Sequence, residues 1–248
     1  MTGTMIITGA SRGIGAATAV LAAERGYDVC VNYRRDADAA RSVVSTVEQL
    51  GGRAVAVAGD VSVEADVEML FSACIEAFGA PHAVVNNAGI LHQQARLDTF
   101  TVERLQEVVA VNVVGAFLVA REAVRHMSTA HGGGGGAIVN VSSAASYLGS
   151  PNEFIDYAAT KGALDTMTIG LAKEVATEGV RVNAVRPGLI DTDIHASSGE
   201  AGRVERLAPV VPMQRGGTAE EVAETILWLA SPLAGYVTGA MLNVSGGR

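Results

Sequence analysis

The sequence predicts an α/β fold, a single doubly wound sheet of about seven parallel strands with helices on both faces. Short apolar segments alternate with longer segments whose apolar residues recur at helical spacing along almost the whole chain. Strands that alternate with helices in this way pair in parallel through right-handed crossovers. No Pro-rich linker or change in composition divides the 248 residues, so we expect residues 1–248 to form one domain.

The predicted strands are short apolar runs rich in Val, Ile and Ala. They cover residues 4–8, 28–33, 54–58, 83–86, 137–142, 181–186 and 241–244. The predicted helices repeat apolar residues every three or four positions and cover residues 14–25, 37–50, 65–78, 102–127, 157–178 and 219–230. Residues 191–212 have neither pattern. Loops of this length in compact domains are often functional, so we expect a substrate lid there, with a disordered loop as the alternative.

The composition limits the possible functions. The formal net charge is −8 and aromatic residues make up only 4% of the chain, which argues against nucleic-acid binding. No apolar run reaches the roughly 20 residues of a membrane span, and no basic segment precedes the first apolar one, as in a signal peptide. Cys30 and Cys74 lie in apolar segments, and the five histidines show no metal-ligand spacing. We therefore expect a cytoplasmic protein without a metal site.

A glycine-rich turn follows the first predicted strand. Its glycines, Gly9, Gly13 and Gly15, have the spacing G-x-x-x-G-x-G and enclose Ser11, Arg12 and Ile14. Glycines at such a turn let a pyrophosphate approach the backbone, and the N-terminus of the following helix supplies N–H donors. The pattern favours a dinucleotide-binding turn, and an ordinary tight turn between strand and helix is the alternative.

The end of the second strand is where dinucleotide-binding proteins select their cofactor. An acidic residue there would bind the adenosine ribose and repel a 2′-phosphate, whereas this chain has Arg34 and Arg35, with Arg12 in the glycine-rich turn. Guanidinium groups bind phosphate through charge-assisted hydrogen bonds. We therefore predict that NADP(H) is favoured over NAD(H). The alternative is that Arg34 and Arg35 only begin a solvated helix.

A tyrosine and a lysine in the fifth predicted helix form a candidate acid/base pair. Tyr157 and Lys161 are four residues apart, which places them on one face of a helix. The chain contains only two lysines among its 18 Lys and Arg residues, so a lysine at this position indicates a chemical use. An ammonium group near a phenol favours the phenolate and would lower the phenol pKa from its usual value near ~10.

Together with these features, four further segments resemble the short-chain dehydrogenase/reductase family over nearly the whole chain. They are Asp60-Val61, Asn86-Asn87-Ala88-Gly89, Ser142-Ser143 and the segment from Pro187 to Thr192. The resemblance implies a Rossmann-type fold and a dinucleotide-binding and catalytic domain. It also implies cofactor contacts from the glycine-rich turn, Arg34, the tyrosine–lysine pair and nine further residues: Asp60, Val61, Asn87, Ala88, Gly89, Pro187, Gly188, Ile190 and Thr192.

The resemblance also implies a catalytic tetrad of Asn112, Ser143, Tyr157 and Lys161. Tyr157 would be the acid/base, Lys161 would hold the nicotinamide ribose, Ser143 would bind the substrate oxygen, and Asn112 would support a proton relay. We choose Ser143 over Ser142 because neighbouring residues of a strand point to opposite faces and the family places its serine where the strand ends.

The substrate is predicted only as a class, a small carbonyl or secondary alcohol compound. The chain resembles 3-oxoacyl-carrier-protein reductases and glucose-1-dehydrogenase-like members, so 3-oxoacyl reduction is an alternative. Glu178 argues against it, since carrier-protein reductases commonly have Arg there. Tyr147, Leu148, Phe154 and Leu189 would line an apolar mouth. A dinucleotide-binding redox sensor without turnover is a further alternative. The apolar surface of the helices at 102–127 and 157–178 predicts a homotetramer, with a dimer as the second choice.

Overall fold

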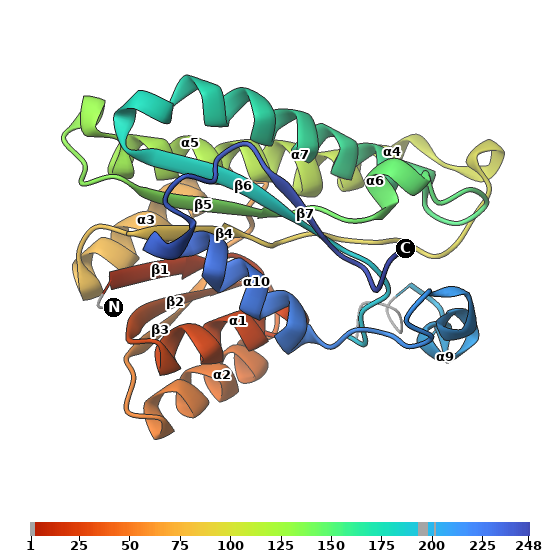
Figure 1. Cartoon of the computed structure of the whole chain (residues 1–248), viewed down its shortest axis with the longest axis horizontal. Coiled ribbons are helices and arrows are strands. Elements are labelled where there is room, and N and C mark those ends of the chain that lie inside the picture. Colours follow the sequence, from red (N-terminus) through yellow and green to blue (C-terminus); the bar gives the residue numbers. More distant parts are fainter. Residues whose placement is uncertain (1–2, 193–197, 201) are drawn as a thin grey trace.

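A computed structural model of the chain contains one sheet of seven parallel strands in the order β3-β2-β1-β4-β5-β6-β7 (Figure 1). This strand order confirms the predicted doubly wound α/β architecture. The structure describes residues 3–192, 198–200 and 202–248. The strands are β1 (Gly3–Ile7), β2 (Tyr27–Tyr33), β3 (Ala54–Ala58), β4 (Ala83–Asn86), β5 (Gly136–Val141), β6 (Val180–Pro187) and β7 (Met241–Val244).

Helices cover both faces of the sheet. The α-helices are α1 (Gly13–Glu24), α2 (Ala37–Gln49), α3 (Glu64–Phe78), α4 (Val102–Val109), α5 (Ala116–Met127), α6 (Ala145–Leu148), α7 (Ile155–Glu174), α9 (Arg203–Leu207) and α10 (Ala219–Ala230). Short 3-10 helices lie at η1 (Leu97–Thr99), η3 (Thr129–His131), η4 (Ala176–Glu178), η5 (Ala208–Val210) and η6 (Pro232–Ala234), and a π-helix at η2 (Ala110–Gly115).

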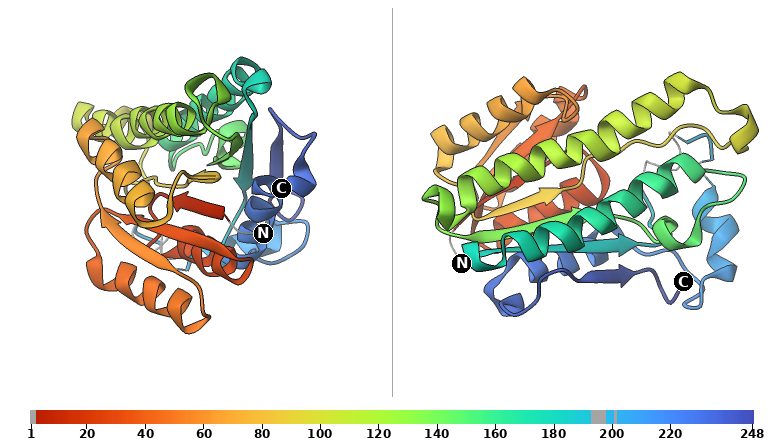
Figure 2. Two further views of the ribbon diagram at one scale, coloured as in Figure 1. Left: turned by 90° about the vertical axis from the view of Figure 1, so that its left-hand side faces the viewer. Right: turned by 90° about the horizontal axis from the view of Figure 1, so that it is seen from above.

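Two apolar cores lie on the two faces of the sheet. In one core, residues of α1, α2 and α10 pack against the strands, and in the other, residues of α3, α5 and α7 do so. Figure 1 shows these two helical layers, and Figure 2 shows α5 and α7 running side by side over the sheet. Alanines and valines dominate both cores, which explains how a chain with so few aromatic residues is well packed.

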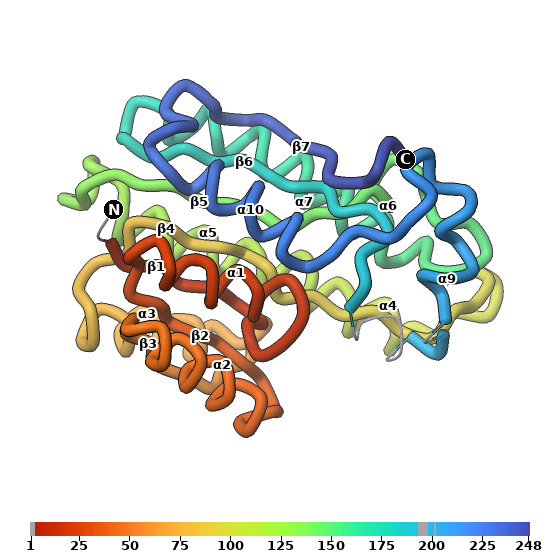
Figure 3. The backbone as a smooth tube through the Cα atoms, turned by 60° about the horizontal axis from the view of Figure 1, so that its bottom comes forward, coloured from red at the N-terminus to blue at the C-terminus, as the bar shows by residue number. Residues whose placement is uncertain are grey.

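The strand order reverses between β1 and β4. From β1 the chain proceeds outward to β2 and β3, and then returns to place β4 on the other side of β1. In open parallel sheets, ligands bind at this switch point, beyond the carboxyl ends of the strands. Residues from the loops after β1, β4, β5 and β6, together with Arg203 of α9, line one cleft at this edge, and Figure 3 shows α9 at the same end of the molecule as α4 and α6. The sheet therefore gathers the predicted motifs at one edge.

The largest departure from the predicted elements is in the helix at 102–127. It is divided into α4 and α5 by the π-helix η2, which contains Asn112. A second departure is in the segment 191–212, predicted to be irregular. It contains α9 and η5, whereas residues 193–197 and 201 of the predicted lid lie outside the described residues. The helix at 157–178 begins earlier, at Ile155, and its last turn is the 3-10 helix η4.

Candidate active site

A cleft of about 810 Å³ opens at the carboxyl edge of the sheet. It is lined by eighteen of the predicted site residues, most of which follow strands of the sheet and two of which, Tyr157 and Lys161, lie in α7. From the predicted set these are Gly9, Ser11, Arg12, Gly13, Ile14, Arg34, Asp60, Val61, Asn87, Ala88, Gly89, Ser143, Tyr157, Lys161, Pro187, Gly188, Ile190 and Thr192. Two predicted residues, Gly15 and Asn112, lie behind this lining.

The glycine-rich turn is held by its neighbour after β4. Gly9 and Gly13 have φ of 60° and 56°, a region that favours glycine. A Cβ atom on Gly9 would lie 3.0 Å from the Cα of Ala88. The Asn87 Nδ2 donates to the carbonyls of Thr8 (2.8 Å) and Gly9 (3.0 Å). A Cβ on Gly15 would meet the Gly9 carbonyl at 2.7 Å, so Gly15 permits close packing of the turn and does not line the cleft.

The N-terminus of α1 is open toward this turn. Arg12, the N-cap residue, makes no side-chain cap, and the first turn of α1 contains no acidic residue. The first N–H groups of a helix need acceptors, and the helix dipole favours an anion at that end. Together with the two left-handed glycines, the start of α1 fits a pyrophosphate group.

Arginines gather where the adenosine end of a dinucleotide would lie. Arg12, Arg34 and Arg35 all line the cleft, and the Arg34 Nε lies 2.7 Å from Oδ2 of Asp60. Burial opposes ionisation of Asp60, but hydrogen bonds from Ser62 and the charges of Arg34 and Arg35 hold its pKa below the usual value. Asp60 therefore neutralises part of this positive charge.

The two serines at the end of β5 have different environments. The Ser142 hydroxyl is buried and donates to the Lys161 carbonyl at 3.2 Å. Ser143 lines the cleft, and its side chain acts to lower the pKa of the Tyr157 phenol. The serine that faces the phenol is thus the one chosen from the sequence. Its Oγ also accepts from the Ala145 N–H at 3.1 Å, which fixes it at the start of α6.

Tyr157 and Lys161 meet in a desolvated environment. The Lys161 Nζ lies 5.4 Å from the centroid of the Tyr157 ring and donates to the Val141 carbonyl at 2.7 Å. Burial raises the pKa of Tyr157 to about 12, opposed by the Ser143 hydrogen bond. Burial also lowers the pKa of Lys161 to about 8, opposed by the Asp165 carboxylate. The predicted lowering of the phenol pKa by Lys161 is therefore not seen: burial raises this pKa, and the group that opposes burial is Ser143.

Asn112 holds the backbone at the floor of the cleft. Its Oδ1 accepts from the Ile90 N–H at 2.8 Å, and its Nδ2 donates to the Ile90 carbonyl at 3.0 Å and to the Thr160 hydroxyl at 3.2 Å. A Cβ on Gly89 would lie 3.5 Å from both Asn112 Oδ1 and Lys161 Nζ. The π-helix η2 therefore places Asn112 in the neighbourhood of the lysine, and π-helical segments are frequent at functional sites.

Arginine side chains that the sequence reasoning missed lie at the mouth of the cleft. Arg203 of α9 is buried, donates to both carboxylate oxygens of Glu153, and lies over the Phe154 ring at 5.3 Å. Arg248 also lines the cleft. A signal for Arg203 was available, since it falls in the predicted lid, but its partner Glu153 is 50 residues away.

Two predictions about the mouth were wrong. Leu148, Phe154 and Leu189 line the cleft, but Tyr147 does not; its hydroxyl donates to the Arg248 carbonyl at 2.8 Å. Glu178 lies in η4, just before β6, and accepts a hydrogen bond from Ser128. It is thus at the amino edge of the sheet, opposite the cleft, and does not affect the entrance within one chain.

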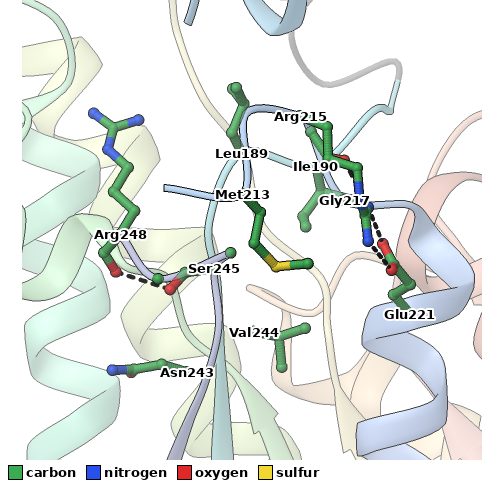
Figure 4. Close-up of a pocket in the computed structure, with 13 residues that line it drawn as sticks. Leu189, Ile190, Met213, Arg215, Gly217, Glu221, Asn243, Val244, Ser245 and Arg248 are labelled. Atoms are coloured by element: carbon green, nitrogen blue, oxygen red, sulfur yellow. Dashed lines mark hydrogen bonds and ion pairs between the residues drawn. The ribbon is translucent and has the colours of Figure 1, made fainter. Parts of the chain in front are cut away.

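A second cavity of about 390 Å³ lies beside the first. Leu189, Ile190 and Arg248 line both cavities. Figure 4 shows the Met213 side chain in the second cavity and the ion pair of Arg215 with Glu221 at its side. Those two charges are paired with each other at the side of the cavity.

Residues 3–192, 198–200 and 202–248 contain no group of three His, Cys, Asp or Glu side chains able to hold a metal ion. Within the same ranges, no helix has the length and apolar character needed to span a bilayer.

Comparison with other proteins identifies the family. A family model described as enoyl-(acyl carrier protein) reductase matches residues 9–248. The chain is 53% identical over 243 residues to the uncharacterized oxidoreductase YgfF of Escherichia coli, covering 98% of each chain. It is 41% identical to 3beta-hydroxysteroid dehydrogenase 1 of Eggerthella lenta, covering 98% of this chain and 92% of that protein.

Two solved structures are similar to this chain over nearly its whole length. A 3-ketoacyl-(acyl-carrier-protein) reductase from Brucella melitensis in complex with NADH has a TM-score of 0.91 and 33% identity, covering 99% of this chain and 98% of that chain. A short chain dehydrogenase from Burkholderia cenocepacia in complex with NADP has a TM-score of 0.89 and 32% identity, covering 99% and 97%. This chain belongs to the short-chain dehydrogenase/reductase family and is an oxidoreductase.

Proposed function

We propose that this protein is an NADP(H)-dependent reductase that interconverts a carbonyl compound and a secondary alcohol. The observation that supports this most directly is the meeting of Ser143, Tyr157 and Lys161 in the cleft that also contains the glycine-rich turn. A proton donor, a hydroxyl and an ammonium group beside a dinucleotide-sized cleft are the components that carbonyl reduction needs.

The residues of the cleft fit a nicotinamide dinucleotide. The two left-handed glycines and the open N-terminus of α1 would hold its pyrophosphate. Pro187, Gly188, Ile190 and Thr192 would hold the nicotinamide end, and the Thr192 side chain would lie 3.5 Å from a Cβ built on Gly13. When bound, the cofactor supplies or accepts the hydride.

Three arginines support NADP(H) over NAD(H). Arg12, Arg34 and Arg35 line the cleft beyond β1 and β2, and a 2′-phosphate is a favourable partner for guanidinium groups. The carboxylate of Asp60 pairs with the Nε of Arg34. The two terminal nitrogens of Arg34 would then bind the phosphate. Neighbouring structures contain NADH in one case and NADP in another, so the choice depends on these side chains.

Each of the four residues of the tetrad has a separate role. Tyr157 donates its phenolic proton to the carbonyl oxygen in reduction and accepts a proton in oxidation. Ser143 donates a hydrogen bond to the substrate oxygen and stabilises the charge that develops there. Lys161 holds the nicotinamide ribose. Asn112 fixes the Ile90 backbone and supports a proton relay behind Lys161.

The experiment that tests this function is a titration with NADPH and NADH, followed by a panel of carbonyl compounds. We expect tight NADPH binding and oxidation of NADPH with simple ketones or aldehydes. Tighter binding of NADH would contradict our interpretation of the arginines. Binding without turnover across the panel would support the alternative of a redox sensor.

A 3-oxoacyl-(acyl-carrier-protein) reductase is the second candidate. It is supported by the similarity to the Brucella melitensis reductase and to a 3-oxoacyl-[acyl-carrier-protein] reductase of Synechocystis, 38% identical over 243 residues. The position of Glu178 away from the cleft removes the argument that we drew from it. Adding an acetoacetyl thioester to the carbonyl panel distinguishes the candidates, since a marked preference for it would favour this function.

The surroundings of the site also belong to the proposal. We infer that residues 191–212 act as a lid over the substrate, supported by the contact of Arg203 with Glu153.

Exposed apolar side chains of α4 and α5, among them Val109 and Phe117, support a homotetramer, with a dimer as the second choice. The buried, unpaired thiols of Cys30 and Cys74 are consistent with a cytoplasmic location.

A further inference from the structure

A partly buried ion pair lies one helical turn from the candidate catalytic lysine. Asp165 is one helical turn beyond Lys161 in α7, so the two side chains share a face of the helix. The Nε and Nη2 atoms of Arg186, in β6, donate to Oδ2 of Asp165 at 3.0 and 2.8 Å. Asp165 is only 7% exposed. A charged pair at this depth is costly unless its hydrogen bonds are complete.

The hydrogen bonds of this pair are incomplete. Both Arg186 nitrogens bind the same oxygen, and Oδ1 of Asp165 is buried without a hydrogen-bond partner among the described residues. Another aspartate of α7 shows the contrast. Asp156 is 8% exposed and uses both oxygens to bind Arg104, at 2.6 and 3.2 Å. A pair that only stabilised the fold would be expected to resemble Asp156 with Arg104.

The charges around Lys161 explain the arrangement. The titratable and charged groups that face it are Tyr157 and Asp165 from α7 and, through Asp165, Arg186 from β6; β5 and η2 contribute the neutral Val141 carbonyl and Asn112. Lys161 itself is 3% exposed. Without Asp165, the buried Lys161 and the partly buried Arg186 would have no anion between these two helix and strand positions to offset their charges.

We propose that Asp165, held by Arg186, is a positioning residue that keeps the buried Lys161 ammonium charged and in place for the reaction. The inference depends on the proposed function for its purpose, but the electrostatic coupling itself can be measured without turnover. The Asp165 carboxylate opposes the burial that lowers the pKa of Lys161. Arg186 weakens the action of Asp165 by sharing its charge.

The two partners should therefore act in opposite directions. Asp165→Asn removes the anion, so the pKa of Lys161 should fall, by about one pH unit. Arg186→Gln leaves the Asp165 charge unshared, so the pKa of Lys161 should rise. A merely structural role would weaken folding in both variants without producing opposite signs.

The chain is suited to a direct measurement because it contains two lysines, Lys161 and the exposed Lys173. Lysine labelled with carbon-13 at Cε gives two NMR signals, assigned with Lys173→Arg, and the cofactor-free protein is titrated. We expect Lys161 to titrate near 8 in the wild type, at lower pH in Asp165→Asn and at higher pH in Arg186→Gln. Asp156→Asn is the matched control and should leave the titration unchanged.

Shifts of the same sign in the two variants, or shifts no larger than that of Asp156→Asn, would overturn the proposal. If Asp165→Asn does not fold, the upward shift in Arg186→Gln still decides. With an active substrate in hand, the alkaline limb of kcat/KM should move to lower pH by about one pH unit in Asp165→Asn. If the protein shows no turnover, the NMR titration still tests the coupling. Failure of the proposed function can therefore be distinguished from failure of this inference.

Discussion

At the scale of single residues, burial affects the two ionisable groups of the candidate tetrad in opposite directions. It raises the pKa of the Tyr157 phenol to about 12 and lowers the pKa of the Lys161 ammonium to about 8. In both cases the neutral form is favoured, as desolvation requires. A phenol that stays protonated at neutral pH is a proton donor, so the site is better prepared for carbonyl reduction than for alcohol oxidation.

This difference predicts how the two directions depend on pH. Oxidation needs the phenolate, and because the pKa of Tyr157 is raised, that form becomes abundant only at high pH. Between about pH 6 and pH 8, the rate of alcohol oxidation should rise roughly tenfold per pH unit, while carbonyl reduction stays nearly constant. The check is kcat in both directions at saturating substrate. An oxidation rate that is flat over this range would contradict the account of Tyr157.

Cofactor choice also belongs to single side chains. Arg34→Gln should weaken NADPH binding by about tenfold or more, because a charge-assisted hydrogen bond to a phosphate is lost. NADH binding should change little. Fluorescence titration with both cofactors measures this, and Arg53→Gln is a control, since Arg53 pairs with Asp28 and does not line the cleft. Equal losses for NADPH and NADH would show that Arg34 does not contact a 2′-phosphate.

Some residues of the site could be predicted from the sequence and others could not. The glycine-rich turn and the pair Tyr157 and Lys161 are local patterns, so their spacing was sufficient. Arg203 with Glu153, and Asp165 with Arg186, are joined across 50 and 21 residues. Such pairs depend on how the elements pack, which no local pattern records. The burial that sets the phenol pKa is equally invisible in the sequence.

At the scale of elements, the predicted strands agree closely with the structure, while two helices do not. Strands buried on both faces read as short apolar runs, which makes their position plain. The π-helix η2 was missed because the valines at 108–114 continue the helical pattern across it. Only the contacts of Asn112 with Ile90 and Thr160 explain the extra residue in that turn.

The link between α9 and the loop before α7 gives a prediction at this scale. Arg203→Gln breaks the ion pair with Glu153 and should loosen the contact between α9 and the loop before α7 at the mouth of the cleft. We expect the KM of the carbonyl substrate to rise by about tenfold, with little change in kcat or in NADPH affinity. Arg215→Gln, which breaks the similar pair with Glu221 outside the cleft, is the matched control. An unchanged KM in Arg203→Gln would contradict the role of α9 as part of a lid.

At the scale of the whole molecule, exposed apolar side chains support the proposed assembly. The segment formed by α4, η2 and α5 presents five exposed apolar residues: Val102, Leu105, Val109, Val114 and Phe117. Large exposed apolar surfaces often mark interfaces. A doubly wound sheet already has both faces covered by helices, so this surface is available for another copy of the chain.

Phe117→Glu should therefore reduce the size of the assembly, since a buried carboxylate without a partner is costly at an interface. Light scattering coupled to size-exclusion chromatography would show a tetramer for the wild type and a smaller species for the variant. Met69→Glu, an exposed apolar position on α3, is the control and should leave the mass unchanged. A monomeric wild type would contradict the proposed assembly.

The most direct test of the proposed function is the rate of NADPH oxidation by Tyr157→Phe, measured beside NADPH binding with a carbonyl substrate that the wild type reduces. The substitution removes one oxygen atom and keeps the ring beside Lys161. We predict a loss of turnover of about a thousandfold or more, within the range known for general acids, with NADPH affinity nearly unchanged. Turnover like that of the wild type would show that Tyr157 is not the proton donor.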